Sequence, residues 1–449
     1  MAIGLSLLAG CNAPKEVAGD DRSLDFTADW AFRLGDDTAA ARPDYNDADW
    51  RKLNLPHDWA IEGEFSKDNP SGTGGGALPG GIGWYRKTFT ADKADEGKRY
   101  RIDFDGAYMN STVYINGHEL GTRPYGYISF SYDLTPYIKW GVENVLAVRV
   151  DNAEQPNSRW YSGCGIYRNV WLTKLNPAHI AQWGTYVTAE DVSKNSAQLK
   201  IRTKLQYDAE AQMADVVLQS RLVDADGNAV GEAVSEAQLM PLTPAEVEQE
   251  IHLKNPRLWS IDTPYMYRVE SILKDKQTGE VLDRYYTPTG IRTFRFDAQK
   301  GFILNGEQVK INGVCMHHDL GCLGAAVNTR AIERQLEILK EMGCNGIRCS
   351  HNPPAPELLD LCDRMGFIVS RDLSCHGSQL NGDIYQHTVI KISYYGAENR
   401  GIGKSRNCHH FLDVLVGLAK GICPCAGKLE VSVLVLVSCD KLLAAAAVA

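Results

Sequence analysis

The chain has 449 residues, a length that suggests about three domains. It is 44% hydrophobic and 23% charged, values that exclude a disordered chain and a multi-span membrane protein. Its net charge of −9 gives no reason to expect nucleic acid as a partner. The 9 Trp and 20 Tyr fit a surface that handles sugars or peptides.

The first ten residues are almost wholly apolar and run directly into Leu8-Ala-Gly-Cys11. This segment resembles the lipobox of bacterial lipoproteins, whose leader is cleaved so that the cysteine becomes the lipidated N-terminus. No Lys or Arg precedes the apolar run, so the usual positive region is missing, and a frayed apolar terminus is the alternative. With Cys11 lipidated, residues 1–23 are leader and tether. The protein is then a periplasmic or surface lipoprotein of a bacterial cell envelope, held to the membrane by a lipid anchor only.

Residues 24–297 contain many short segments of alternating polarity separated by turn residues. The segments 99–105, 112–115, 144–150 and 170–172 predict strands, and the pair Asn116-Gly117 predicts a tight turn. Their spacing indicates an antiparallel sandwich or jelly roll over residues 24–177. Further alternating segments, such as 197–202 and 215–220, predict an immunoglobulin-like β-sandwich over residues 178–297.

The periodicity changes after residue 297. A buried strand is predicted at 309–315, and residues 331–342 carry apolar side chains at helical spacing. A strand at 345–348, a helix at 356–365 and a strand at 367–369 follow. This alternation is the opening of a parallel α/β domain, so residues 298–369 are interpreted as a partial TIM (β/α)8 barrel with two and a half of its eight units.

The segment 370–449 loses this strand–helix alternation. It holds Cys408, Cys423, Cys425 and Cys439 and ends in an alanine-rich run that is too short to span a bilayer. We interpret it as an aberrant tail that arises from a reading-frame error or gene decay. A genuine divergent tail is the alternative.

Three stretches together carry a family resemblance. They are residues 55–59 (Leu-Pro-His-Asp-Trp) with 78–87, residues 157–168, and residues 343–354 with 360–369. In this order they resemble glycoside hydrolase family 2, most of all its bacterial β-galactosidase branch, from about residue 24 to 369. The resemblance implies a sugar-binding jelly roll, an immunoglobulin-like sandwich and a TIM barrel. It also implies hydrolysis of terminal β-galactosides, with β-mannosides and β-glucuronides as open alternatives.

The resemblance also implies a retaining mechanism with two glutamates, on the fourth and seventh barrel strands, the first of them preceded by Asn. Such carboxylates flank the scissile bond at about 5–5.5 Å from each other. No Asn-Glu pair follows Val369. We therefore expect both catalytic glutamates to be missing, so that this chain is inactive alone and activity belongs to the full gene product. The alternative is a non-catalytic surface carbohydrate-binding protein or a decayed family member.

Several residues around the expected site are assigned by resemblance. His351 and Asn352 are expected to bind an oligosaccharide or β-galactoside, and a capped loop histidine is the alternative for His351. Arg348 is expected either to tune a carboxylate or to form a salt bridge in the barrel mouth. Arg159 and Trp160 lie in a loop expected to reach the mouth, where Trp160 either stacks on sugar or packs between domains. Asp319 belongs to the same site architecture.

Two groups of residues have the side chains of a metal site but not its usual spacing. They are His317, His318 and Asp319 with His351, and Cys408-His-His410 with Cys423-Pro-Cys425. No metal site is predicted from them. No cofactor is certain, although a divalent cation is compatible with the resemblance.

Overall fold

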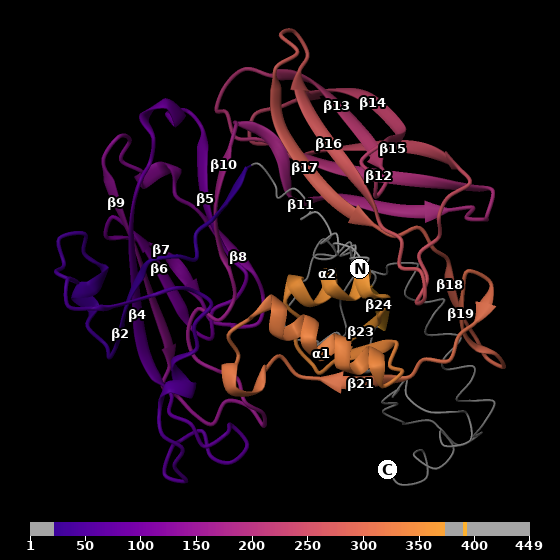
Figure 1. Ribbon diagram of the computed structural model, residues 1–449. Coiled ribbons are helices and arrows are strands. Elements are labelled where there is room, and N and C mark those ends of the chain that lie inside the picture. Colours follow the sequence, from indigo (N-terminus) through magenta and orange to yellow (C-terminus); the bar gives the residue numbers. More distant parts are fainter. Residues whose placement is uncertain (1–21, 373–388, 393–449) are drawn as a thin grey trace, which may run out of the picture.

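The structure, a computed structural model, describes residues 22–372 and 389–392. Its first two parts are β-sandwiches, and the third is a parallel sheet with two helices that lies between them (Figure 1). Cys11, the two cysteine-rich tail motifs and most of residues 370–449 lie outside the described residues.

The first part is an antiparallel sandwich of ten strands, as expected for the jelly roll. Aromatic side chains such as Trp30, Tyr85 and Phe104 fill the space between its two sheets. The strands β6 and β7 are joined by Asn116 and Gly117, whose positive φ values of 51° and 85° suit a tight hairpin turn. One sheet contains, in spatial order, β3 (Arg51–Leu53), β2 (Trp30–Leu34), β4 (Gly81–Thr90), β9 (Glu143–Asn152), β6 (Ser111–Ile115) and β7 (His118–Arg123). The other contains β1 (Ser23–Asp25), β10 (Val170–Leu175), β5 (Arg99–Phe104) and β8 (Phe130–Asp133).

The second part is the predicted immunoglobulin-like sandwich, with two sheets that bury alternate residues of their strands between them. One sheet contains β11 (Ala178–Glu190), β12 (Ser196–Tyr207) and β15 (Ala245–Lys254). The other contains β14 (Ala229–Leu239), β13 (Ala214–Val223), β16 (Tyr267–Asp275) and β17 (Val281–Thr289).

The third part begins with a small antiparallel sheet and continues as a parallel one. Its helices pack on the parallel strands through a core that includes Leu336, Leu359 and Phe367. The antiparallel sheet contains β18 (Phe294–Asp297), β19 (Gly301–Leu304) and β20 (Glu307–Gln308). The parallel part contains β21 (Gly313–Met316), α1 (Thr329–Glu341), β22 (Gly346–Cys349), α2 (Pro356–Met365), β23 (Ile368–Asp372) and β24 (Val389–Ile392). The described residues also form five short 3-10 helices: η1 (Thr38–Ala41), η2 (Trp59–Glu62), η3 (Lys93–Asp95), η4 (Thr135–Tyr137) and η5 (Gly321–Leu323).

Two expectations for this part are corrected. The strand predicted to be buried at 309–315 is shorter and shifted, and its Cys315 is exposed on a face of the described sheet. The first helix begins two residues earlier than predicted, because the Asn328 side chain caps it by accepting from Ala331 N. A fourth parallel strand, β24, lies within residues 370–449 and pairs with β23. The interpretation of that segment as an aberrant tail stays a prediction.

The jelly roll packs against the carboxyl ends of the parallel strands. The buried Arg168 donates from Nη2 to the carbonyl of Pro353, which follows β22, at 2.8 Å. The backbone N of Val327 donates to the carbonyl of Tyr167 at 2.9 Å. These contacts fix the jelly roll beside the strand ends where sites form in parallel α/β proteins.

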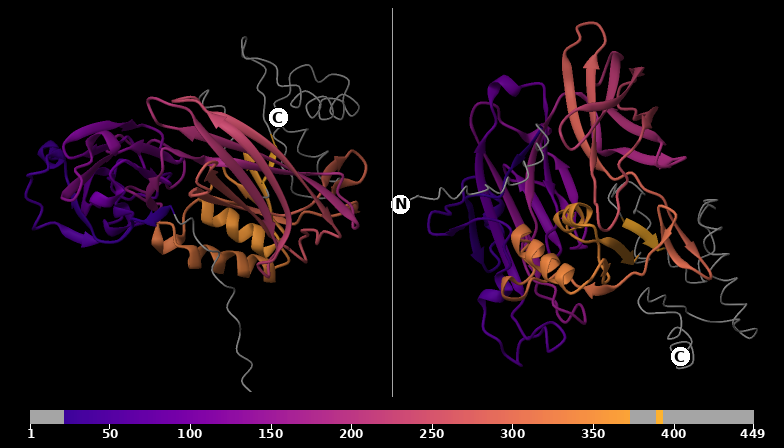
Figure 2. Two further views of the ribbon diagram at one scale, coloured as in Figure 1. Left: turned by 90° about the horizontal axis from the view of Figure 1, so that it is seen from above. Right: turned by 45° about the vertical axis from the view of Figure 1, so that its right-hand side comes forward.

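The immunoglobulin-like domain packs at the opposite end of the strands (Figure 2). Its Trp259 is fully buried against Phe302, Leu304 and the start of β23 at Ile368. The indole Nε1 of Trp259 donates to the carbonyl of Asp363 at 2.7 Å. The parallel sheet is thus held at one end by each β domain.

Candidate functional site

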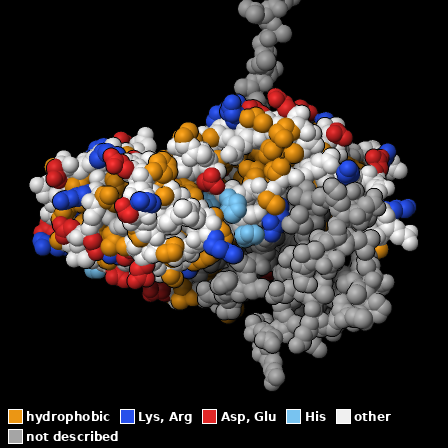
Figure 3. All heavy atoms as spheres, turned by 90° about the horizontal axis from the view of Figure 1, so that it is seen from below, with side chains coloured by type: hydrophobic (Ala, Val, Ile, Leu, Met, Phe, Trp, Pro, Cys, Tyr) orange, Lys and Arg blue, Asp and Glu red, His pale blue; other side chains and the backbone are white. Residues whose placement is uncertain are grey.

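Three aromatic rings meet at the carboxyl ends of β21 and β22, and we call them the mouth cluster: Trp160, His317 and His351. Trp160 comes from the jelly roll and the two histidines from the loops after the strands. The ring centroids of Trp160 lie 5.6 Å from His317 and 5.8 Å from His351, and the two imidazoles are 6.1 Å apart. Histidine side chains gather near the middle of the surface where the domains meet (Figure 3).

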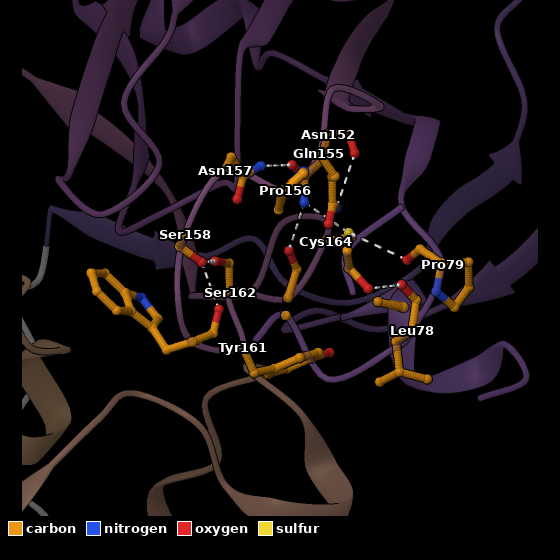
Figure 4. A pocket seen from close by; sticks show the side chains of 15 residues that line it. Leu78, Pro79, Asn152, Gln155, Pro156, Asn157, Ser158, Tyr161, Ser162 and Cys164 are labelled. Carbon is orange, nitrogen blue, oxygen red and sulfur yellow. Dashed lines mark hydrogen bonds between the residues drawn. The ribbon is translucent and has the colours of Figure 1, made fainter. Parts of the chain in front are cut away.

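Hydrogen bonds within its own domain hold Trp160 in place. Its Nε1 donates to the Tyr127 hydroxyl at 3.1 Å, and its carbonyl accepts from Ser158 Oγ at 2.6 Å. Ser158 and Ser162 point toward one another beside a polar pocket that encloses only about 10 Å³ (Figure 4). This pocket has no room for a sugar, so it supports the loop and does not bind the ligand.

Arg348 lies beside His351 at the end of β22. The distance from its Nη2 to His351 Nδ1 is 3.4 Å, and its Nη1 donates to Ser350 Oγ at 3.1 Å. Its Nη1 is also 3.6 Å from the sulfur of the exposed Cys315. A guanidinium therefore stands next to the ring cluster, as its place on the strand predicts.

Asn352 joins the mouth to the jelly roll. Its Oδ1 accepts from the hydroxyl of Tyr125 at 3.2 Å, across the domain boundary. The pattern of the sequence offered no signal for Tyr125. Its partner lies 227 residues further along the chain.

Two predicted site residues stand apart from the mouth cluster. Arg159 is exposed on the jelly-roll loop. Asp319 lies close enough to Tyr161 and His318 to act on both: its negative charge adds to the rise that burial causes in the pKa of Tyr161 and opposes the fall that burial causes in the pKa of His318. The structure thus brings together four of the six predicted sugar-binding residues: Trp160, Arg348, His351 and Asn352.

Asp58 is a structural residue whose role the sequence did not reveal, although it lies in the quoted motif 55–59. Its side chain is 2% exposed and accepts from the backbone N of Ala60, Cys164 and Ala325 and from the Tyr161 hydroxyl. Burial raises the pKa of Asp58 despite these donors. One carboxylate therefore links the jelly roll to the loop after β21.

The ring of His318 turns inward, whereas the ring of its neighbour His317 faces Trp160. Its Nε2 lies 3.1 Å from the carbonyl of Ser162, so Nε2 carries the proton. Burial lowers the pKa of His318 to about 4, so the ring is neutral near pH 7. Neutral His318 thus connects the loop after β21 to the loop that carries Trp160.

Acidic groups are also buried where the jelly roll meets α2. Burial and then the carboxylate of Glu357 raise the pKa of Asp105 to about 7. Burial likewise raises the pKa of Glu357, whose Oε1 accepts from Asn169 Nδ2. The bond from Asn169 to Glu357 joins the jelly roll to α2 at this point.

The arrangement suits a hydroxyl-rich ligand. Aromatic faces at the mouth provide an apolar surface for stacking, while Arg348 and the imidazoles provide hydrogen-bonding groups around it. Within residues 22–372, no three His, Cys, Asp or Glu side chains are grouped in a way that could hold a metal ion.

Comparison with protein families matches three consecutive domains of one family to the chain. The sugar-binding domain of glycosyl hydrolases family 2 matches residues 78–177, a second domain of that family matches residues 178–292, and its TIM-barrel domain matches residues 297–401. The order of these matches is the order of the three folded parts.

Individual relatives agree with this family. The chain is 64% identical over 362 residues to the β-galactosidase BoGH2A of Bacteroides ovatus, covering 81% of this chain and 42% of that protein. It is 33% identical over 376 residues to a β-glucuronidase of Formosa agariphila, covering 79% of this chain and 38% of that one. A solved family 2 structure from Bacteroides cellulosilyticus superposes with a TM-score of 0.76 at 39% identity, over 79% of this chain and 46% of that one. The chain spans less than half the length of these relatives, and it belongs to glycosyl hydrolase family 2.

Proposed function

We propose that the protein to which this chain belongs hydrolyses terminal β-galactosides. The observation that carries the proposal is the 64% identity over 362 residues to a β-galactosidase. The mouth cluster supports it, because it places stacking and hydrogen-bonding groups where sites form in TIM barrels. In this proposal Trp160 stacks on the sugar ring, while His351 and Arg348 bind its hydroxyls and Asn352 holds the loop after β22 against Tyr125.

The reaction that we propose is retaining hydrolysis by two glutamates. One protonates the glycosidic oxygen while the other attacks the anomeric carbon, and water then releases the sugar from the covalent intermediate. We propose that neither glutamate lies within these 449 residues. The 449-residue chain then binds the sugar without hydrolysing it.

The test combines a binding measurement with an activity assay on the purified 449-residue chain. Titration with methyl β-galactoside, followed by ligand-observed NMR, is expected to show saturable binding that Trp160→Ala weakens. Trp183→Ala, in the immunoglobulin-like domain, is the matched control and is expected to bind like the unaltered chain. If methyl β-glucuronide or methyl β-mannoside bound more strongly than methyl β-galactoside, the substrate would be a β-glucuronide or a β-mannoside instead.

The same preparation tests for catalysis. No release of nitrophenol from an aryl β-galactoside is expected, and clear turnover would refute the absence of the catalytic pair. Sequencing of the gene beyond codon 369 separates a catalytic gene product from a non-catalytic binding protein. A shifted frame that encodes Asn-Glu and further strands supports the former.

We also propose that the protein is a lipoprotein of the bacterial envelope, anchored through Cys11. In the described part of the chain, no helix combines the length and the apolar character needed to cross a membrane. Metabolic labelling with a palmitate analogue in a bacterial host is expected to label the protein, and Cys11→Ala is expected to abolish the label. Equal labelling of the variant would contradict the anchor.

A further inference from the structure

A second cavity lies next to the mouth cluster, between the jelly roll, the loops after β21 and β22, and helix α1. It has a volume of about 40 Å³. Apolar side chains form part of its wall, including Ile332 and Leu358. The polar lining residues include His317 and Ser350 as well as four that come from four separate segments: Arg168, His318, Gln335 and Asn352.

Each of these four residues has a buried polar atom without a hydrogen-bond partner among the described residues. The atoms are Arg168 Nε, His318 Nδ1, Gln335 Oε1 and Asn352 Nδ2. Arg168 has no exposed surface at all, and its Nη atoms already donate to backbone carbonyls. Because buried polar groups are nearly always hydrogen-bonded, four residues with such atoms in the lining of one cavity point to a shared occupant.

The donor and acceptor roles of the four atoms define that occupant. Arg168 Nε and Asn352 Nδ2 can only donate, and Asn352 Oδ1 is already an acceptor for Tyr125. His318 carries its proton on Nε2, so its Nδ1 accepts, as does Gln335 Oε1. The occupant must therefore both accept and donate two hydrogen bonds.

We propose that this cavity is a binding site for ordered water, which joins Arg168 of the jelly roll to His318, Gln335 and Asn352 of the barrel domain. Water both donates and accepts two hydrogen bonds. An anion would leave the two acceptors unpaired, and a metal cation would face the Arg168 guanidinium. A cavity needs roughly 10–15 Å³ for one water, so this volume holds a small cluster.

The water site lies between the loops that carry two of the three rings of the mouth cluster. His318 adjoins His317, and Asn352 adjoins His351, so the water bridges the loops that carry two rings of the mouth cluster. Arg168 connects the same water to the domain that supplies Trp160. The site thus cross-links the segments that form the mouth.

The direct test is a crystal structure of the 449-residue chain, with and without a bromide soak. We expect density within about 2.7–3.2 Å of all four atoms and no anomalous bromide signal in the cavity. A bromide peak in the cavity would show that the site binds an anion and would overturn the proposal. A dry cavity, or side chains that pair directly with one another, would also overturn the proposal.

A pair of variants on α1 tests the site in solution. Gln335→Leu removes one acceptor at nearly constant volume, and Arg334→Leu makes a comparable change at the exposed neighbouring position. We expect Gln335→Leu to lower the Tm clearly more than Arg334→Leu does, and its crystal structure to lack the water bound to that acceptor. An unchanged Tm for Gln335→Leu would refute the role of the water.

Discussion

Replacing Asp58 by Asn tests how strongly one carboxylate holds the jelly roll to the barrel domain. The change preserves shape but turns one acceptor oxygen into an NH2 group. In one orientation this group faces Ala325 N–H and the Tyr161 hydroxyl, and in the other it faces the N–H groups of Ala60 and Cys164. The Tyr161 hydroxyl can turn to accept from the NH2 group, so the first orientation sets only Ala325 N–H against a donor, whereas the second sets both Ala60 and Cys164 N–H against one. The site is 2% exposed, so water does not replace the lost acceptor.

The size of the effect follows from the bonds that are lost. Hydrogen bonds to charged groups contribute roughly 1.5–3 kcal/mol each, so losing one contact in the better orientation predicts a destabilisation of about 2 kcal/mol. With a urea dependence of about 2 kcal/mol per molar, the unfolding midpoint of the jelly roll falls by about 1 M. Asp58→Ala, which leaves all four donors without a partner, is expected to cost more.

The assay is urea unfolding followed by tryptophan fluorescence, with Asp37→Asn as the control. Asp37 caps η1 as Asp58 caps η2, but it is exposed and contacts only its own domain. Because Asn caps a helix about as well as Asp, this control should change stability by less than about 0.5 kcal/mol. A shift for Asp58→Asn no larger than the control would refute the role of Asp58 as an interdomain link.

Three further predictions follow from the other contacts. Trp160→Ala should weaken binding of methyl β-galactoside at least roughly tenfold, or about 1.4 kcal/mol, in the NMR titration. Trp160→Phe should retain part of the binding free energy, because it keeps an aromatic face. Equal affinities for the variants and the unaltered chain would exclude stacking. Between pH 3.8 and about pH 7, Asp105 keeps its proton in the folded protein but loses it in the unfolded chain, because the pKa rises from 3.8 to about 7 on folding. The free energy of unfolding should therefore fall as pH rises through this window. Asp105→Asn should flatten that fall in a series of thermal melts, and an unaltered slope would contradict it. Trp259→Ala should cost about 3–5 kcal/mol and speed proteolysis near residues 290–300, whereas unchanged cleavage would show that the indole does not hold the domains together.

Local signals in the sequence predicted much of the fold. Asn116-Gly117 identified the β6–β7 hairpin, because both residues tolerate positive φ. Pro356 and Gly366 bound α2, where the proline lacks the N–H that a first turn leaves unpaired and the glycine adopts φ 75°. These features depend on a few neighbouring residues, so they can be read along the chain.

The contacts across domains could not be predicted in this way. Asp58 and Ala325 are 267 residues apart, and only the folded chain shows that one accepts from the other. His317 and His318 are adjacent and chemically identical, yet one faces the mouth and the other the interior, because the loop after β21 is not a regular strand with fixed alternation. The motifs indicated which segments form the site but not which side chains support it.

The clamping of the parallel sheet at both ends has a consequence for synthesis. Both β domains precede the parallel strands along the chain, and domains generally fold as units in the order in which they leave the ribosome. When β21, β22 and β23 emerge, Arg168 and Trp259 are already available as fixed docking points at the two ends of these strands. The β domains thus act as a template that sets the length and direction of the first strands before later ones arrive, which shortens the time that an unpaired strand edge is exposed to other nascent chains.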